Sequence, residues 1–159
     1  MQTLTKTLLV ATVLTVTTPA FSAEVPYPKG YRDWHHVKSM VINPGHALHE
    51  AFGGIHHLYA NKKAQAGYAK GKFPDGAVIV FDLLEANDGG NAVVEGARKV
   101  VGVMIKDAKR FAATGGWGFE GFKGDSKTER AVGKNANSAC FQCHAPQKAN
   151  DYVFSKLRP

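Results

Sequence analysis

A short run near the C-terminal end contains both cysteines of this chain and a histidine directly after them, Cys140-Phe-Gln-Cys143-His144. Two cysteines three positions apart at the start of a helix lie on nearly the same face, so both sulfurs can reach the two vinyl groups of one porphyrin. The histidine is then carried beneath the iron as its axial ligand. The run predicts one covalently attached haem c per chain, bound by Cys140, Cys143 and His144, with His144 as the metal ligand.

Other uses of a Cys-x-x-Cys pair fit this sequence less well. A redox disulfide usually lies near a βαβ pattern, and no such pattern precedes this pair. A zinc site needs four ligands, and no second Cys-x-x-Cys or Cys-x-x-His pair completes one. Since the chain has two cysteines in all, no disulfide remains once both bind haem, and the haem itself becomes the covalent staple.

Residues 1–23 have the features of a secretory signal peptide. Lys6 is their only charge, the stretch from Leu8 to Val16 is apolar or Thr, and small residues place the cleavage point between Ala20 and Ala23. The apolar run is too short to span a bilayer, and no later run has that length. We therefore expect export to the periplasm, with residues 24–159 forming one haem domain.

The basic charge of the chain bears on its partners. The formal net charge of +7 becomes +6 when the single lysine of the signal peptide is removed (7 − 1 = 6), and two haem propionates lower it further. Export makes nucleic acid an implausible partner. Attraction to an acidic redox partner protein or to an anionic membrane face is the better interpretation.

The hydrophobic pattern predicts five strands and a few short helices. The strands are expected at residues 31–42, 55–60, 77–84, 98–106 and 117–122, and the helical stretches at 62–69, at 107–113 and in a last helix that carries the haem motif and ends near Leu157. The near-continuous apolar run at 77–84 implies burial on both faces. Period two at 117–122 places Trp117 and Phe119 on one face and Glu120 and Phe122 on the other.

The position of the haem motif narrows the class of cytochrome. The commonest small c-type cytochromes carry the motif near the mature N-terminus and supply a methionine ligand later in the chain. Here 15 residues follow His144 (159 − 144), and none of them is methionine. A four-helix haem protein is also disfavoured, because the middle of the chain is rich in Val, Ile, Gly and turn pairs.

Five pieces of the sequence resemble the cytochrome P-460 and cytochrome c′-beta family. They span nearly the whole mature chain and are Tyr31-Arg-Asp-Trp34, Phe73-Pro-Asp-Gly76, Lys106-Asp-Ala-Lys-Arg-Phe111, Gly116-Trp117-Gly-Phe119 and the terminal Cys140-to-His144 run. The resemblance implies an α+β fold with an antiparallel sheet of about five strands flanked by short helices. It also implies a homodimer, and a haem with His144 on one side and no protein ligand opposite.

The resemblance implies two activities and leaves a third class open. Some family members bind nitric oxide in a hydrophobic pocket, and nitric oxide binding or detoxification at a five-coordinate haem is the favoured function. Others oxidise hydroxylamine, with a lysine side chain additionally bonded to the porphyrin ring. A six-coordinate electron-transfer cytochrome is the remaining alternative, so whether the chain is an enzyme stays open.

Lys70 lies where the family's cross-linking lysine is found, and Lys72 is the neighbouring candidate. The alternative is a solvated lysine at a helix end. Phe73 resembles an aromatic residue of the haem pocket wall, for which the alternative is ordinary core. Glu120, at the end of a strand beside an open iron position, would move protons during hydroxylamine oxidation. Its alternative is an exposed residue on a polar face.

The remaining histidines and methionines suggest further ligands. His35 and His36 fall on a predicted strand adjacent to that of His56 and His57, so the two pairs could meet and bind a second metal, although paired exposed histidines on a sheet explain them as well. Met40 and Met104 lie in predicted strands, where we expect them to be core residues rather than a sixth iron ligand.

Overall fold

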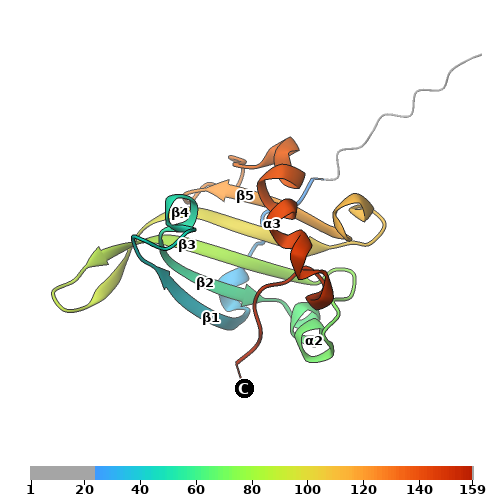
Figure 1. Ribbon diagram of the computed structural model, residues 1–159, viewed down its shortest axis with the longest axis horizontal. Helices are drawn as coiled ribbons and strands as arrows, with labels where there is room; N and C mark the ends of the chain where they lie inside the picture. The colour runs from blue at the N-terminus through green and yellow to red at the C-terminus, as the bar shows by residue number, and fades with distance from the viewer. Residues whose placement is uncertain (1–23, 159) are drawn as a thin grey trace, which may run out of the picture.

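Segments rich in β-branched and aromatic residues form the framework of this protein, because such side chains fit a pleated, half-buried surface. The computed structural model describes residues 24–158. Its strands are β1 (His35–Ile42), β2 (Gly54–Ala60), β3 (Val78–Asp88), β4 (Val93–Lys106) and β5 (Trp117–Lys123). Each strand pairs antiparallel with the next, in the order β1-β2-β3-β4-β5 (Figure 1). The predicted α+β class is confirmed, whereas the predicted signal peptide lies outside the described residues.

Short helices lie between and after the strands. They are η1 (Tyr31–Asp33), α1 (His49–Phe52), α2 (Lys62–Lys70), η2 (Ala112–Thr114), η3 (Gly133–Asn135), η4 (Asn137–Phe141), α3 (Gln142–His144) and η5 (Ala145–Asn150). The predicted start of α2 is confirmed, since the Asn61 side chain accepts a hydrogen bond from the Ala64 N–H at 2.8 Å. Residues 133–150, the C-terminal helical segment, cross in front of the sheet in Figure 1.

Alternation along the strands gives the sheet two faces with different coverings. We call the side that packs against the C-terminal helical segment the helix face; Ile79, Met104 and Phe119 form one of its cross-strand rows. The other side, the opposite face, carries Val80, Val101 and Phe122 and is covered by residues from the N-terminal end, among them Val25 and Tyr31. The predicted burial of β3 on both faces is confirmed. So is the predicted division of β5, with Trp117 and Phe119 on the helix face and Phe122 on the opposite face.

Polar groups of the opposite face are buried in pairs. Asp82 is 2% exposed; it accepts a hydrogen bond from the Tyr31 hydroxyl at 2.7 Å and one from Arg98 Nε at 2.6 Å. Burying a carboxylate without such partners would be costly. The opposite face is therefore closed by both apolar packing and paired charges.

Several predicted boundaries were wrong. The third strand runs to Asp88 instead of ending at residue 84, and the helical stretch predicted at 107–113 is limited to η2. Residues 31–33 form a 3₁₀ turn, so the first strand begins at His35. β4 begins at Val93 rather than at residue 98, because β3 and β4 form a long hairpin whose pairing extends to Asp88 and Val93. The last helix ends at Asn150 rather than near Leu157, since the next two residues adopt left-handed backbone conformations that no helix can continue through.

No helix within residues 24–158 combines the length and the apolar character needed to cross a membrane.

Candidate haem site

The two cysteines lie in the middle of the C-terminal helical segment. Cys140 belongs to η4, a short π-helical stretch of the kind often found at functional sites, and Cys143 belongs to α3. Cys140 is half-buried against the helix face, whereas Cys143 is exposed, and neither forms a disulfide. Burial, together with the nearby Glu120 and Cys143, raises the pKa of the Cys140 thiol to about 11. Since zinc binding and disulfide exchange need thiolates, this environment disfavours both.

His144 is held in the form that suits iron binding. Its Nδ1 atom lies 2.8 Å from the carbonyl oxygen of Tyr152, so Nδ1 carries the hydrogen and donates it, which leaves the lone pair on Nε2. Burial lowers the pKa of His144, and the hydrogen bond to Tyr152 offsets only part of this. The imidazole lies between Phe119 and Phe154, with ring centroids 5.1 and 4.9 Å away.

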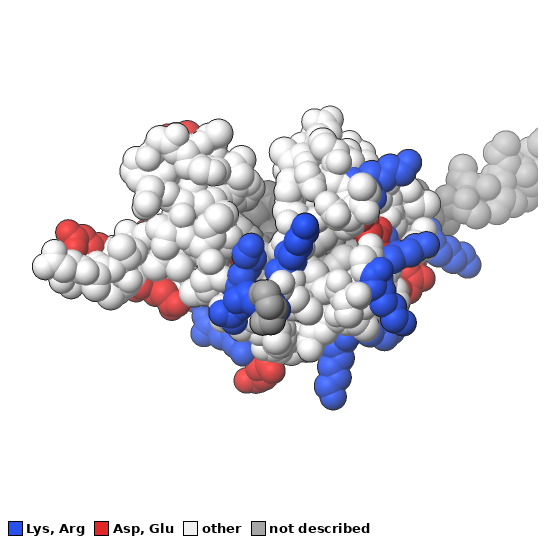
Figure 2. Space-filling model, turned by 60° about the horizontal axis from the view of Figure 1, so that its bottom comes forward, with Lys and Arg blue, Asp and Glu red and all other residues white. Residues whose placement is uncertain are grey.

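A hollow lies on the helix face beside this segment. In Figure 2 two lobes rise from the sheet with a gap between them, one formed by the α1 loop and the other by the C-terminal helical segment. The register explains part of the gap, because Phe81, Gly102 and Gly121 face one another across β3, β4 and β5. Gly102 has no side chain of its own, and the nearest atoms to the position of an added Cβ belong to Phe81, at 3.4 Å. The side of Gly121 is covered by Val100, Ala131 and Val132.

The α1 side of this hollow is apolar and aromatic. Phe52 of α1 packs edge-to-face on Phe81 of β3, with ring centroids 5.7 Å apart. Phe81 also stacks on His56, at 4.6 Å. Phe52 was not among the predicted site residues, because the sequence pattern indicated no helix or strand between the expected strands at 31–42 and 55–60. Phe81 could have been found, because alternation along its strand places it on the same face as Ile79.

These residues fit a haem. Two free thiols and an imidazole with its Nε2 lone pair available belong to the C-terminal helical segment on one side of the hollow, and aromatic rings lie on the far side. Flat apolar porphyrin faces suit such walls. Cys140 and Cys143 would hold the porphyrin and His144 its iron.

Comparison with known protein families agrees with this geometry. The model of the Cytochrome P460 family matches residues 28–155. This chain belongs to the cytochrome P460 family. The resemblance predicted from five short motifs is therefore confirmed, and family membership identifies haem as the cofactor. No curated protein matched the sequence.

In this cytochrome P460 family member, the two candidates for a lysine-to-haem cross-link, Lys70 and Lys72, lie at the end of α2 and just beyond it. Lys70 is the last residue of the helix, Gly71 ends it with a φ of 68°, and the side chains of Lys70 and Lys72 are exposed. Phe73 is buried instead, in contact with Tyr68 and Trp117 at ring distances of 5.0 and 5.3 Å. The structure thus places Phe73 in the core between α2 and β5; its contact with haem stays a prediction.

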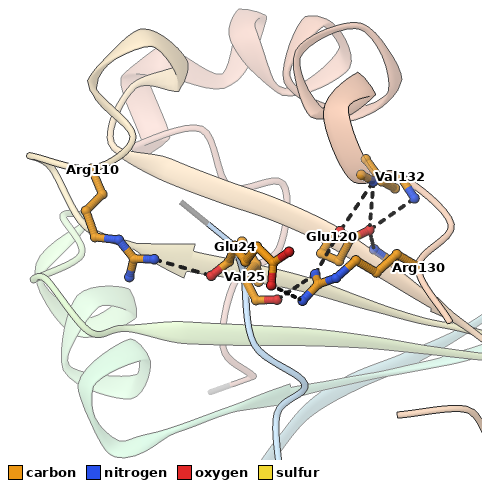
Figure 3. Close-up of polar contacts among 8 residues, drawn as sticks. Glu24, Val25, Arg110, Glu120, Arg130 and Val132 are labelled. Carbon is orange, nitrogen blue, oxygen red and sulfur yellow. Dashed lines mark hydrogen bonds and ion pairs between the residues drawn. The ribbon is translucent and has the colours of Figure 1, made fainter. Parts of the chain in front are cut away.

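Glu120 lies on the opposite face of the sheet, buried, and Figure 3 shows its contacts. Its carboxylate accepts hydrogen bonds from the Arg130 guanidinium at 2.9 Å and from the N–H groups of Gly121, Val132 and Gly133 at 2.9 to 3.1 Å. Burial alone raises the pKa of Glu120, but these hydrogen bonds together hold it below its usual value. The alternative of an exposed Glu120 was wrong. Its role in proton transfer stays a prediction.

Arg130 extends this cluster to the N-terminal end of the described chain. Its Nη1 atom donates to the Val25 carbonyl at 2.9 Å, and its Nη2 atom lies 3.3 Å from the Glu24 carboxylate. Arg110 donates to the Glu24 carbonyl at 3.3 Å (Figure 3). Glu120 therefore anchors the start of the C-terminal helical segment and links it to residues 24 and 25.

Two of the remaining histidines meet as the strand pattern suggested. The rings of His36 and His57 are 5.9 Å apart, and the Ser39 hydroxyl lies 2.8 Å from one and 2.6 Å from the other. Across residues 24–158, no group of three or more His, Cys, Asp or Glu is arranged to hold a metal ion. His56 is buried, and its Nδ1 atom lacks a hydrogen-bond partner among the described residues.

Met40 and Met104, the two candidate methionine ligands, differ in burial. Met104 packs on the helix face beside Phe119, so its predicted core position is confirmed. Met40 is 45% exposed, and the prediction that it is a core residue was wrong. It lies on β1, which is an edge strand of the sheet.

Proposed function

We propose that this chain is an exported c-type cytochrome whose single, covalently attached haem is five-coordinate and binds nitric oxide or another small nitrogen oxide. The observation that carries the proposal is His144, whose Nδ1 donates to the Tyr152 carbonyl and leaves Nε2 free next to two unpaired cysteines. When bound, the haem supplies an iron with one open coordination position. The residues of this chain hold that iron from one side and shape what reaches the other.

The apolar far side of the hollow supports a neutral ligand. Phe52 and Phe81 pack there edge-to-face, and an apolar wall penalises charged or strongly hydrogen-bonding ligands whose polar groups would be left unpaired. Nitric oxide is small and uncharged, so it loses little on entering such a site. We therefore favour nitric oxide binding or detoxification over hydroxylamine oxidation.

The six-coordinate electron carrier is the rival proposal, and the structure changes its candidate ligand. Met40 is exposed on an edge strand, and Met104 lies beside Phe119, which itself contacts the His144 ring. Met104 is therefore on the side of His144. His56 is the better candidate, because it is buried beside Phe81, its Nδ1 is unpaired, and burial, aided by nearby positive groups, lowers its pKa to about 4 and keeps it neutral.

Optical spectra of the ferrous protein separate these proposals. A five-coordinate haem should show a high-spin spectrum and bind carbon monoxide and nitric oxide. A low-spin spectrum that ignores carbon monoxide would instead establish a sixth side-chain ligand. In that case His56→Leu should convert the spectrum to high-spin, and Met104→Leu serves as the matched control.

A lysine-to-haem cross-link would mark the hydroxylamine-oxidising class. Lys70 and Lys72 are exposed next to the loop whose Phe73 N–H donates to Asp151 at 2.8 Å, close to the C-terminal helical segment. We propose the form without the cross-link. The mass of haem peptides after proteolysis tests this, since a cross-linked product would join the segment with Lys70 to that with Cys140 and Cys143.

Export, partners and assembly complete the proposal. We propose that residues 1–23 direct the chain to the periplasm, where its basic surface meets an acidic redox partner. We also propose a homodimer, supported by the exposed side chains of Val93 and Val94 on the β3–β4 hairpin, which extends beyond the sheet in Figure 1. The mass of the mature N-terminal peptide and sedimentation of the purified protein test these two statements.

A further inference from the structure

Two consecutive residues just beyond the C-terminal helical segment have an unusual backbone conformation. Asp151 has a φ of 51° and Tyr152 a φ of 64°, and neither is glycine. Asp tolerates this left-handed region, but for a bulky residue such as Tyr it is an outlier. Such conformations persist only where the surrounding structure holds them, and they concentrate at functional sites.

Asp151 is held by three other parts of the chain. The Lys106 ammonium of β4 lies 2.6 Å from its Oδ1 atom, the Phe73 N–H donates to its Oδ2 atom at 2.8 Å, and the Trp117 indole N–H donates to its carbonyl oxygen at 2.8 Å. The ion pair is largely buried, with side-chain exposures of 8% for Lys106 and 12% for Asp151.

Lys106 is itself fixed from two further directions. It donates to the Gly115 carbonyl at 3.0 Å and lies over the Trp117 ring, 5.0 Å from its centroid. Trp117 is fully buried. A buried ammonium with this set of partners has one well-defined position, because any displacement would leave a charge unpaired in the interior.

The contacts that hold Asp151 also position the next residue, Tyr152. Tyr152 turns its carbonyl oxygen toward His144 and accepts the Nδ1 hydrogen bond at 2.8 Å. Its ring packs in the space that Gly115 leaves, where an added Cβ atom would come within 2.2 Å of it. The hydrogen bond to His144 therefore depends on a turn that the Lys106–Asp151 pair and Trp117 keep in place.

We propose that Lys106 and Asp151 are positioning residues for the axial histidine: by fixing the turn at 151–152 they aim the Tyr152 carbonyl at Nδ1 and so set the orientation and basicity of His144. This rests on the proposed function, in which His144 binds the iron. An outer hydrogen-bond partner of a metal-bound histidine fixes its tautomer and raises its basicity as a ligand. Without the Lys106–Asp151 pair, the iron–imidazole bond is weaker. The ferric state is then less stable, relative to the ferrous state, than in the wild-type protein.

The test compares Lys106→Met with Arg98→Met in the full-length haem-loaded protein. Arg98 forms a similarly buried pair with Asp82, with exposures of 10% and 2% and an Nε–Oδ1 distance of 2.6 Å, but on the opposite face of the sheet. Both variants should melt at lower temperature. Only Lys106→Met should shift the iron–histidine stretching band to lower frequency and the reduction potential to more positive values.

Two further variants keep the inference falsifiable. Lys106→Arg should restore the band at least in part, and Asp151→Asn, which is close in shape, should shift it as Lys106→Met does even if the methionine variant does not fold. A band and a potential that stay at the wild-type values in both Lys106→Met and Asp151→Asn would overturn the inference, as would equal shifts in Arg98→Met.

His144→Ala separates this inference from the proposed function. That variant should retain covalent haem and lose the iron–histidine band altogether. If the band survives in His144→Ala, the axial assignment fails and the proposed function with it. If the band is lost there but unmoved by Lys106→Met and Asp151→Asn, only the positioning role fails.

Discussion

The two faces of the sheet differ in how completely they are covered. On the opposite face, Phe122 and Val101 are almost completely buried and Asp82 is paired with Tyr31 and Arg98. On the helix face, the α1 loop and the C-terminal helical segment stand apart as two lobes with a gap between them (Figure 2). The opposite face is closed by the chain alone, whereas the helix face keeps a gap between its two coverings, which we propose that the haem fills.

Removing the covalent attachment should have the largest effect. We expect Cys140→Ala with Cys143→Ala to abolish covalent haem, because the two thiols are the only cysteines of the chain. Because the helix face would then lack the haem that we propose packs on it, the melting temperature should fall. Haem staining after denaturing electrophoresis measures attachment. Covalent haem retained by this variant through the original route would refute the assignment.

Phe122→Ala tests the closed face. Phe122 is 1% exposed and packs against Tyr27 with ring centroids 5.1 Å apart, so truncation should cost about 3–5 kcal/mol of unfolding free energy through lost burial and a cavity. Denaturant unfolding measures this loss. The ferrous spectrum should stay unchanged, and a shifted spectrum would contradict the separation of the two faces.

Glu120→Gln should cost less, about 1–3 kcal/mol, since a neutral amide keeps part of the hydrogen bonding around Arg130. The folded-state pKa of Glu120 is held below its ordinary value of 4.5. Its contribution to stability is therefore present above pH 4.5 and is lost as the pH falls through the folded-state pKa. Unfolding curves of both proteins between pH 7 and pH 3 should converge at the acid end; parallel curves would speak against this.

Phe52→Ala should have the smallest effect on stability and a selective effect on binding. Its side chain is 38% exposed, so we expect less than about 1 kcal/mol of destabilisation. Because it forms the apolar wall with Phe81, truncation should speed the binding of carbon monoxide to the ferrous protein. Stopped-flow mixing measures the rate, and Leu48→Ala, another exposed apolar residue of the same loop, is the control.

The amino-acid sequence by itself determined the parts of this protein that depend on local pattern. The Cys140-to-His144 run predicted haem, alternation predicted the strands and the two faces of β5, and the order of short motifs predicted the family. Each signal lies within a few residues, since strand alternation and the spacing of two thiols are properties of neighbouring positions.

Only the tertiary structure decided what depends on contacts between distant residues. The last helix stops at Asn150 because Lys106, 45 positions before Asp151, holds a left-handed turn there. Glu120 is buried because N–H groups of residues 121–133 and the Arg130 guanidinium converge on its carboxylate. No local propensity predicts such contacts: a charged residue at a strand end is ordinarily solvated, and it is buried only when folding brings its partners to it.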